Sequence, residues 1–205
     1  MQGKNLYIAL IHYPVKNKNG EVVSTAITNL DLHDMARTAK TYGVAGYYII
    51  NPMAAQRELA ERIIRHWIEG FGAGYNPNRG EALRVIKIVP EFKDALLEIE
   101  RETGTRPKVM ATAARDMGGE DAGYKEGQPD MNGTGGCGVI SFAQAREVLK
   151  NSPSVIAFGT GWGLTDEFID SCDFRLPPIR GAGEYNHLPV RSAAAIILDR
   201  LVGDR

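Results

Sequence analysis

The stretch Val155-Ile-Ala-Phe-Gly-Thr-Gly-Trp-Gly-Leu-Thr165 runs from an apolar strand straight into a turn with three glycines. Gly159, Gly161 and Gly163 let the backbone approach a ligand closely because they carry no side chain. Their spacing is GxGxG, and Leu164 stands where a dinucleotide-binding GxGxxG would have its last glycine. The stretch therefore favours a tight strand-to-helix turn, with a nucleotide site as the alternative, and argues against nicotinamide and P-loop motifs.

Apolar strands alternate with amphipathic helices along the rest of the chain. Alternation of this kind predicts an α/β fold with a mainly parallel sheet and helices on both faces. Strands are expected at residues 6–11, 45–50, 83–89, 108–113, 155–158 and 173–176. All six strands fit one sheet, and residues 1–205 are expected to form a single domain.

Capping residues and apolar stripes locate the helices between these strands. Asp31 is the expected N-cap of a first helix, which Gly43 ends, and a longer helix is expected between about residues 54 and 71. The remaining helix signals are Phe92 to Gly104, the Ser141 and Gln144 capping box, and a last helix that Pro189 opens and Gly203 ends.

Composition limits the classes of function. The chain has 205 residues, 43% hydrophobic and 24% charged, with a net charge of -1, which is typical of a soluble globular protein. That charge argues against bulk coating of nucleic acid, so any RNA site must be a local patch. No apolar run approaches the roughly 20 residues that cross a bilayer, so a cytoplasmic protein without a membrane partner is expected. Cys137 and Cys172 form no CxxC pair, and neither a disulfide nor a metal site is expected.

Three further segments contain residues that could bind a ligand. Residues 116–138 carry eight glycines and are either a surface loop or a lid that substrate orders. Residues 176–187 combine prolines, which fix the backbone, with glycines, which admit a ligand, so their amides and carbonyls can face a purine edge; a plain loop is the alternative. In residues 28–43, Arg37 and Lys40 lie off the apolar stripe, and Arg37 alone would indicate only a charged surface.

Taken together in chain order, segments 28–43, 155–165 and 176–193 resemble the three signature motifs of the SPOUT superfamily of methyltransferases. The first matches at Asn29, Arg37, Thr38, Ala39, Tyr42 and Gly43, the second at Phe158, Gly159 and Gly163, and the third at Pro178, Ile179, Gly181, Asn186, Ser192 and Ala193. Residues 184–193 also resemble a bacterial family of stand-alone SPOUT domains, some of which are fused to a tRNA guanine-N1 methyltransferase. One departure is that Thr160 and Gly161 stand where the ribose methyltransferases usually have Glu or Asn.

The resemblance implies an S-adenosylmethionine-dependent RNA methyltransferase with a C-terminal trefoil knot. It also implies a homodimer whose interface completes the active site. The substrate is expected to be tRNA, with a ribose 2'-hydroxyl preferred over a base nitrogen because of Asn29 and Arg37. The alternatives are a non-catalytic cofactor-binding module that dimerises with a partner methyltransferase, and a methyltransferase for protein or a small molecule.

The same resemblance assigns the site residues. Arg37 would orient the acceptor ribose and its phosphate, since a guanidinium is a poor base, and Asn29 belongs to the same catalytic set. Glu184 and His187 are rival proton acceptors, while Arg180, Arg191 and Arg115 are candidates to line the RNA path. The expected cofactor-binding residues are Ala111, Thr112, Phe158, Gly159, Thr160, Gly161, Gly163, Leu164, Leu176, Pro178, Ile179, Gly181, Tyr185, Asn186, Leu188 and Ser192.

Overall fold

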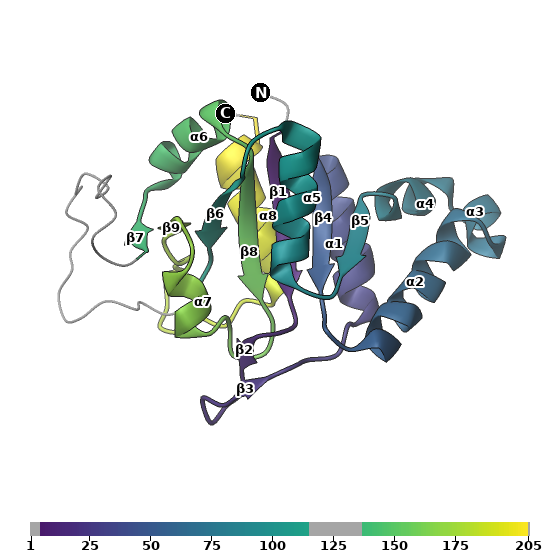
Figure 1. Cartoon of the computed structure of the whole chain (residues 1–205), viewed down its shortest axis with the longest axis horizontal. Coiled ribbons are helices and arrows are strands. Elements are labelled where there is room, and N and C mark those ends of the chain that lie inside the picture. Colours follow the sequence, from purple (N-terminus) through teal and green to yellow (C-terminus); the bar gives the residue numbers. More distant parts are fainter. Residues whose placement is uncertain (1–4, 115–136, 205) are drawn as a thin grey trace.

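A single parallel sheet organises the computed structural model, which describes residues 5–114 and 137–204. Strand β1 (Leu6–Ile11) lies at its centre, between β4 (Gly46–Ile50) and β8 (Ser154–Gly159). The full order is β5-β4-β1-β8-β6-β9-β7, with β5 (Ile86–Val89), β6 (Lys108–Ala111), β7 (Gly138–Val139) and β9 (Phe174–Arg175). All six predicted strands belong to this sheet (Figure 1).

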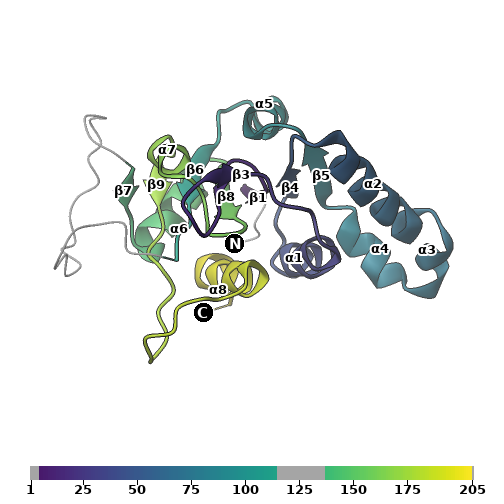
Figure 2. The ribbon, with the colours of Figure 1, turned by 90° about the horizontal axis from the view of Figure 1, so that it is seen from below.

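Both faces of the sheet are covered, which explains why β1 is apolar at every position. Its alternate residues point to opposite faces. Leu6, Ile8 and Leu10 pack in the core below α1 (Asn29–Thr41), α6 (Phe142–Asn151) and α8 (Val190–Val202). Tyr7, Ala9 and Ile11 pack in the core below α5 (Phe92–Thr103) and α7 (Asp166–Asp170). Figure 2 shows α1 and α8 side by side on one face and α5 on the other. The predicted α/β architecture is therefore confirmed.

The helix expected at residues 54–71 is instead two helices. α2 (Ala54–Ile68) ends before Gly70, and Phe71 begins the short helix α3 (Phe71–Tyr75). The Phe71 ring is 82% exposed and does not extend the apolar stripe of α2. A side chain at Gly72 would lie 2.6 Å from the Trp67 ring, so the chain turns back closely on α2 here. Helix α4 (Pro77–Leu83) follows, and it delays the start of β5 to Ile86.

We had expected Asp31 to be the N-cap of α1, but the N-cap is Thr28. The Thr28 hydroxyl accepts a hydrogen bond from the Asp31 amide at 3.2 Å. In return, the Asp31 carboxylate accepts from the Thr28 amide at 2.9 Å, so Asp31 is the third residue of a capping box. The other capping signals are confirmed, namely left-handed Gly104 after α5, the Ser141 and Gln144 box before α6, and Pro189 and Gly203 at the ends of α8.

Most of the predicted loop or lid, together with Arg115, lies outside the described residues. Its last two residues, Cys137 and Gly138, are described, and Gly138 belongs to β7, which pairs with β9. The loop expected at 116–138 therefore ends earlier than predicted. None of the helices in residues 5–114 and 137–204 is long and apolar enough to span a bilayer. The trefoil knot stays a prediction.

Candidate functional site

A cavity of about 910 Å³ opens at the carboxyl end of the sheet. From β1 the chain continues to β4 and β5 on one side of the sheet, whereas β8 and β6 lie on the other side. Crevices at such a reversal of strand order are the usual ligand sites of open α/β sheets. The cavity is lined by residues that follow β6, β8 and β9 and by the N-terminal ends of α1 and α8.

One side of the cavity, which we call the turn wall, consists of residues 158–164. The backbone of this turn folds tightly on itself, since a β-carbon at Gly159 would lie 2.6 Å from the Leu164 amide nitrogen. Gly161 and Gly163 have φ angles of 60° and 99°, which favour glycine. The steric demands of the turn itself therefore account for all three glycines, and the wall is formed without a ligand.

A two-stranded ribbon holds the turn wall from outside. It consists of β2 (Val15–Lys16) and β3 (Val22–Val23), and it was not predicted. Lys16 accepts a backbone hydrogen bond from Trp162 at 2.9 Å and donates one to Gly163 at 2.9 Å. The ribbon lies next to the carboxyl ends of β1 and β8 (Figure 1).

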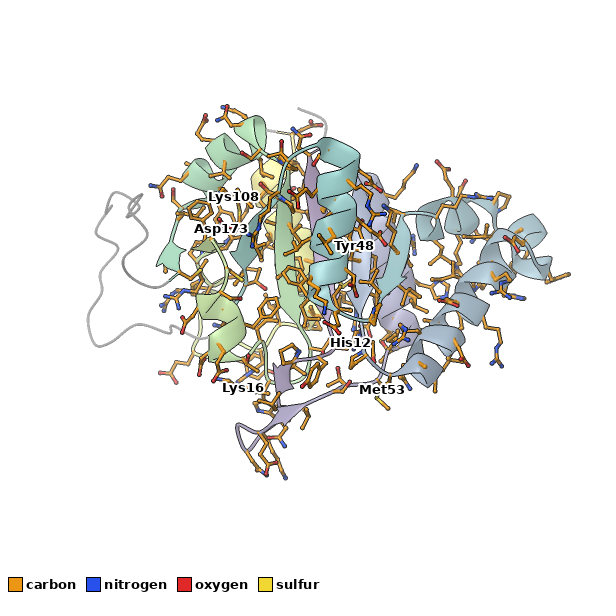
Figure 3. The ribbon with its side chains drawn as sticks, in the orientation of Figure 1. His12, Lys16, Tyr48, Met53, Lys108 and Asp173 are labelled. Carbon is orange, nitrogen blue, oxygen red and sulfur yellow. The ribbon has the colours of Figure 1, made fainter. Side chains whose placement is uncertain are left out.

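Behind the turn wall lies a chain of buried polar side chains. His12 follows β1 and is 0% exposed, and its Nδ1 lies 2.9 Å from Thr25 Oγ1. Thr25 Oγ1 lies 2.5 Å from Thr160 Oγ1, which donates to the Ile11 carbonyl at 3.1 Å. Burial lowers the pKa of His12, while the nearby Asp31 carboxylate acts in the opposite direction. Figure 3 shows His12 just beyond the ends of the central strands.

Charged groups at the cavity are mainly acidic. Asp31, Asp166 and Glu184 line it, together with Lys16. Lys16 Nζ lies 2.5 Å from one carboxylate oxygen of Asp166, and the other oxygen is buried without a hydrogen-bond partner among the described residues. Asp31 is only 8% exposed. The cavity thus suits a ligand with positive charge.

The opposite side of the cavity, which we call the loop wall, consists of residues 177–188. The preceding residue, Leu176, is anchored to the sheet because its amide donates to the Ala111 carbonyl at 2.9 Å. Within the wall, the Asn186 side-chain amide donates to the Ala114 carbonyl at 2.7 Å. Glu184, Tyr185 and most of their neighbours are exposed. Within the wall, the ring centroids of Tyr185 and His187 lie 5.2 Å apart, and most of the loop is exposed to solvent.

Most of the residues predicted for cofactor binding meet at this cavity. Those that line it are Thr112, Phe158, Gly159, Thr160, Gly161, Gly163, Leu164, Ile179, Asn186 and Leu188, together with the predicted proton acceptors Glu184 and His187. Ala111, Leu176, Pro178, Gly181, Tyr185 and Ser192 do not line it. Ala111 and Leu176 are buried at the edge of the sheet below it.

Arg37 and Asn29 lie outside the cavity. Both side chains are exposed on α1, whereas Thr28 and Asp31 line the cavity instead. At about 100° per residue, Arg37 lies roughly 120° around the helix from Asp31. Its positive charge acts on His33, whose pKa is lowered by burial first and by Arg79 and Arg37 after it. The fold of the chain therefore does not bring the expected catalytic set together.

The cavity residues missed from the sequence include Lys16, Thr25, Asp31, Trp162 and Asp166. Asp31 had been assigned only a capping role. No metal site was predicted, and residues 5–114 and 137–204 contain no group of three or more His, Cys, Asp or Glu side chains that could hold one. Burial raises the pKa of Cys137 to about 11 and that of Cys172 to about 12, so both thiols stay protonated at neutral pH.

Known proteins are similar to this chain over nearly its whole length. A family model described as SAM-dependent RNA methyltransferase matches residues 5–203. A protein from Oleidesulfovibrio alaskensis named tRNA (guanine-N(1)-)-methyltransferase is 43% identical over 202 residues, which are 98% of this chain and 43% of that protein. An uncharacterized protein from Aquifex aeolicus is 36% identical over 203 residues, or 98% of this chain and 90% of its own length.

Solved structures match the fold. The SpoU methyltransferase AviRb from Streptomyces viridochromogenes, in complex with the cofactor AdoMet, has a TM-score of 0.55 at 15% identity, covering 96% of this chain and 56% of that one. The SPOUT-type α/β fold predicted from the sequence is thereby confirmed. The chain spans less than half the length of the Oleidesulfovibrio relative. Because the family model matches the chain almost from end to end, the chain belongs to the family of SAM-dependent RNA methyltransferases, and S-adenosylmethionine is its cofactor.

Proposed function

We propose that this chain, acting as one domain, transfers a methyl group to a base nitrogen of tRNA at the cavity beside the turn wall. The observation that carries the proposal is the set of carboxylates at the cavity, Asp31, Asp166 and Glu184. A base N–H must lose its proton to be methylated, and a carboxylate can accept it. Asn29 and Arg37, which led us to prefer a ribose acceptor, lie outside this cavity.

Curated relatives support the choice of substrate. The Oleidesulfovibrio protein carries the name tRNA (guanine-N(1)-)-methyltransferase, so guanine N1 is the acceptor we propose. This chain matches 43% of the length of that protein. The predicted cytoplasmic location belongs to the same proposal, because tRNA is the substrate.

The cavity fits S-adenosylmethionine in size and in lining. Its volume of about 910 Å³ lies within the usual range of ligand sites, roughly 300–1,000 Å³. Phe158, Ile179 and Ile197 supply apolar surface for a purine, and the carboxylates suit a cation. When bound, the cofactor supplies an electrophilic methyl group. The chain must hold the acceptor beside it, exclude water and take up the acceptor's proton.

Glu184 is the proton acceptor we propose. It lies on the exposed loop wall, where RNA can reach it. The two other carboxylates are engaged, since one oxygen of Asp31 accepts from the Thr28 amide and hydroxyl and one oxygen of Asp166 contacts Lys16. His187 lines the same part of the cavity and is the rival acceptor.

A homodimer is part of the proposal because it gives Arg37 a role. Helices α1 and α8 lie side by side on one face (Figure 2). Two exposed apolar side chains, Leu30 in α1 and Leu188 just before α8, are 49% and 44% exposed. If a second copy covers this face, Arg37 of one subunit can bind an RNA phosphate beside the other subunit's cavity through its planar guanidinium.

The acceptor is tested by incubating the protein with labelled S-adenosylmethionine and tRNA that lacks its own modifications, and then digesting the tRNA to nucleosides. Label in 1-methylguanosine supports the proposal. Label in a 2'-O-methylnucleoside contradicts it and supports the second candidate, ribose methylation, which the resemblance of residues 28–43 favours. Cofactor binding without transfer would instead support a non-catalytic module.

The role of Glu184 is tested by Glu184→Gln, which keeps the shape of the side chain but accepts no proton. Transfer should fall by at least about 100-fold, the lower end of the usual effect of a general base, while cofactor affinity stays within about twofold. His187→Gln is the matched control. If that variant loses transfer and Glu184→Gln does not, the rival acceptor is the correct one.

A mixing experiment tests the dimer. Arg37→Ala and Glu184→Gln should each be inactive alone. In a mixed dimer, one cavity has an intact Glu184 and an intact Arg37 from the partner, so mixing equal amounts should restore about a quarter of wild-type activity. Absence of recovery, or a monomer in light scattering, would contradict the shared site.

A further inference from the structure

The hydrogen-bonded chain behind the turn wall can run in either of two directions, because either threonine hydroxyl can be the donor in their mutual contact. A threonine hydroxyl carries one proton, and Thr160 can donate its proton to the Ile11 carbonyl at 3.1 Å or to Thr25. In the direction that ends at the Ile11 carbonyl, Thr160 Oγ1 accepts the proton of Thr25 across their 2.5 Å contact. Thr25 has then used its own proton, so it accepts from Nδ1 of His12 at 2.9 Å.

His12 is the origin of this direction. In the direction that ends at Ile11, its ring carries the proton on Nδ1. Its Nε2 is buried without a hydrogen-bond partner among the residues that the structure describes. A neutral ring fits this environment, because burial lowers the pKa of His12 against the opposing effect of Asp31. The buried imidazole thus determines which way both hydroxyls point.

The consequence at the cavity is a group of acceptors without a donor. Thr25 and Thr160 both line it, and each hydroxyl has given its proton away inside the protein. Asp31 also lines it and, as a carboxylate, only accepts. One of its oxygens is already bonded to Thr28, which leaves the other. We call Thr25, Thr160 and Asp31 the acceptor-only corner.

An ammonium group is the chemical complement of this corner. It has three donors and no acceptor, and the corner offers three oxygens with free lone pairs. The charge of Asp31 favours a cation, since charge-assisted hydrogen bonds are about twice as strong as neutral ones. An adenine amino group has only two donors, and the ring nitrogens beside it need donors that the corner lacks.

We infer that the acceptor-only corner binds the ammonium group of the amino-acid tail of S-adenosylmethionine, and that His12 is the positioning residue that keeps Thr25 and Thr160 as acceptors. This inference rests on the proposed function, in which the cavity holds the cofactor. It assigns the cofactor's tail to the side of the cavity between the turn wall and the start of α1.

Calorimetric titration tests the inference with two ligands. The first is S-adenosylhomocysteine, and the second is its deaminated analogue, in which hydrogen replaces the ammonium group. Wild-type protein should bind the first at least about tenfold more tightly, the usual effect of a hydrogen bond to a charged group. Thr25→Val should reduce affinity for S-adenosylhomocysteine about tenfold and leave the analogue within about twofold. Thr25→Ser, which keeps the hydroxyl, is the matched control and should behave like wild type.

Two other patterns of binding would contradict the inference or the cofactor site itself. If Thr25→Val binds S-adenosylhomocysteine as wild type does, or loses both ligands equally, the corner does not hold the ammonium. If wild-type protein binds neither ligand, the proposed cofactor cavity itself is wrong. Binding of the analogue shows that a variant is folded, and Thr160→Val provides a second route should Thr25→Val fail to fold.

A spectroscopic measurement tests the role of His12 without any ligand. Nitrogen-15 NMR of the imidazole should show His12 protonated at Nδ1 alone at neutral pH. In Thr25→Val, that preference should be lost, because the Nδ1 proton no longer has an acceptor. A wild-type ring protonated at Nε2 would reverse the direction of the chain and overturn the inference.

Discussion

The two walls of the cavity are built in opposite ways. The turn wall, residues 158–164, is held on the outside by Lys16 and from behind by Thr25. Close backbone contacts require glycine at 159 and 161, and a φ of 99° favours it at 163. The loop wall, residues 177–188, is mostly exposed, with Asn186 tying it to Ala114. The turn wall is therefore complete without a ligand, whereas the loop wall should gain its remaining contacts from the cofactor, RNA or a second subunit.

The largest expected difference between the walls is in their tolerance of an added methyl group. In Gly159→Ala, the new β-carbon would lie 2.6 Å from the Leu164 nitrogen and 2.9 Å from the Gly163 carbonyl carbon. The free energy of unfolding should fall by about 3 kcal/mol, and cofactor binding should be lost. Gly183→Ala in the loop wall, where nothing lies within 4 Å, should change it by less than about 0.5 kcal/mol. Equal effects in urea denaturation would contradict the distinction.

Two effects favour glycine at position 161 in the turn wall, namely its backbone conformation and a close contact. Its φ of 60° is strained for other residues, and a β-carbon would lie 2.9 Å from the Lys16 carbonyl oxygen. Gly161→Ala should lower the free energy of unfolding by about 2 kcal/mol. Gly20→Ala, with a φ of 83° and open space, should show the conformational part alone, about 1 kcal/mol. Identical losses in thermal denaturation would mean that the contact with Lys16 adds nothing.

Asn186 tests the loop wall. Because its side chain makes one hydrogen bond, Asn186→Ala should lower the free energy of unfolding by less than about 1 kcal/mol. Cofactor affinity should still fall about fivefold, since the loop loses its tie to Ala114. Gly183→Ala serves as the control for both quantities. A large loss of stability with unchanged affinity would reverse the roles we give to the two walls.

The smallest expected effect on stability comes from the titration of His12, behind the turn wall, below neutral pH. Burial lowers the pKa of His12 below its ordinary value of 6.5, with Asp31 opposing, so the unfolded chain takes up this proton more readily than the folded protein. Stability should therefore decline as the pH falls from 6.5 towards the lowered value, and be unaffected above 6.5. His12→Asn, which can still donate to Thr25 but does not titrate, should show a shallower decline in urea denaturation. The same acid slope in both proteins would rule out His12 as its source.

Much of the fold could be predicted because long apolar strands covered on both faces leave a clear signal. Residues 6–11 are the simplest example, since all six are buried. The β2–β3 ribbon gave no signal because each of its strands has two residues, too few for alternation. The break after Ile68 was missed because Phe71 continues the helical spacing, while the close approach of Gly72 to Trp67 appears only in three dimensions.

The site was predictable where local chemistry and position coincide, as in the turn wall. Thr25 and Lys16 have no motif of their own, and they reach the cavity only because the ribbon folds back on the turn. Arg37 shows the converse, since its motif was recognisable but the side of the helix facing the cavity was not. Asp31 was noticed for its helix end, yet its side chain also lines the cavity.

A crystal structure of the chain with S-adenosylhomocysteine would test most directly whether the two walls together form the cofactor site. We predict that the ligand lies between residues 158–164 and 177–188, that the turn wall keeps its present backbone, and that the loop wall gains contacts with the ligand. A ligand bound elsewhere on the protein, or a turn wall that rearranges while the loop wall does not, would contradict this description.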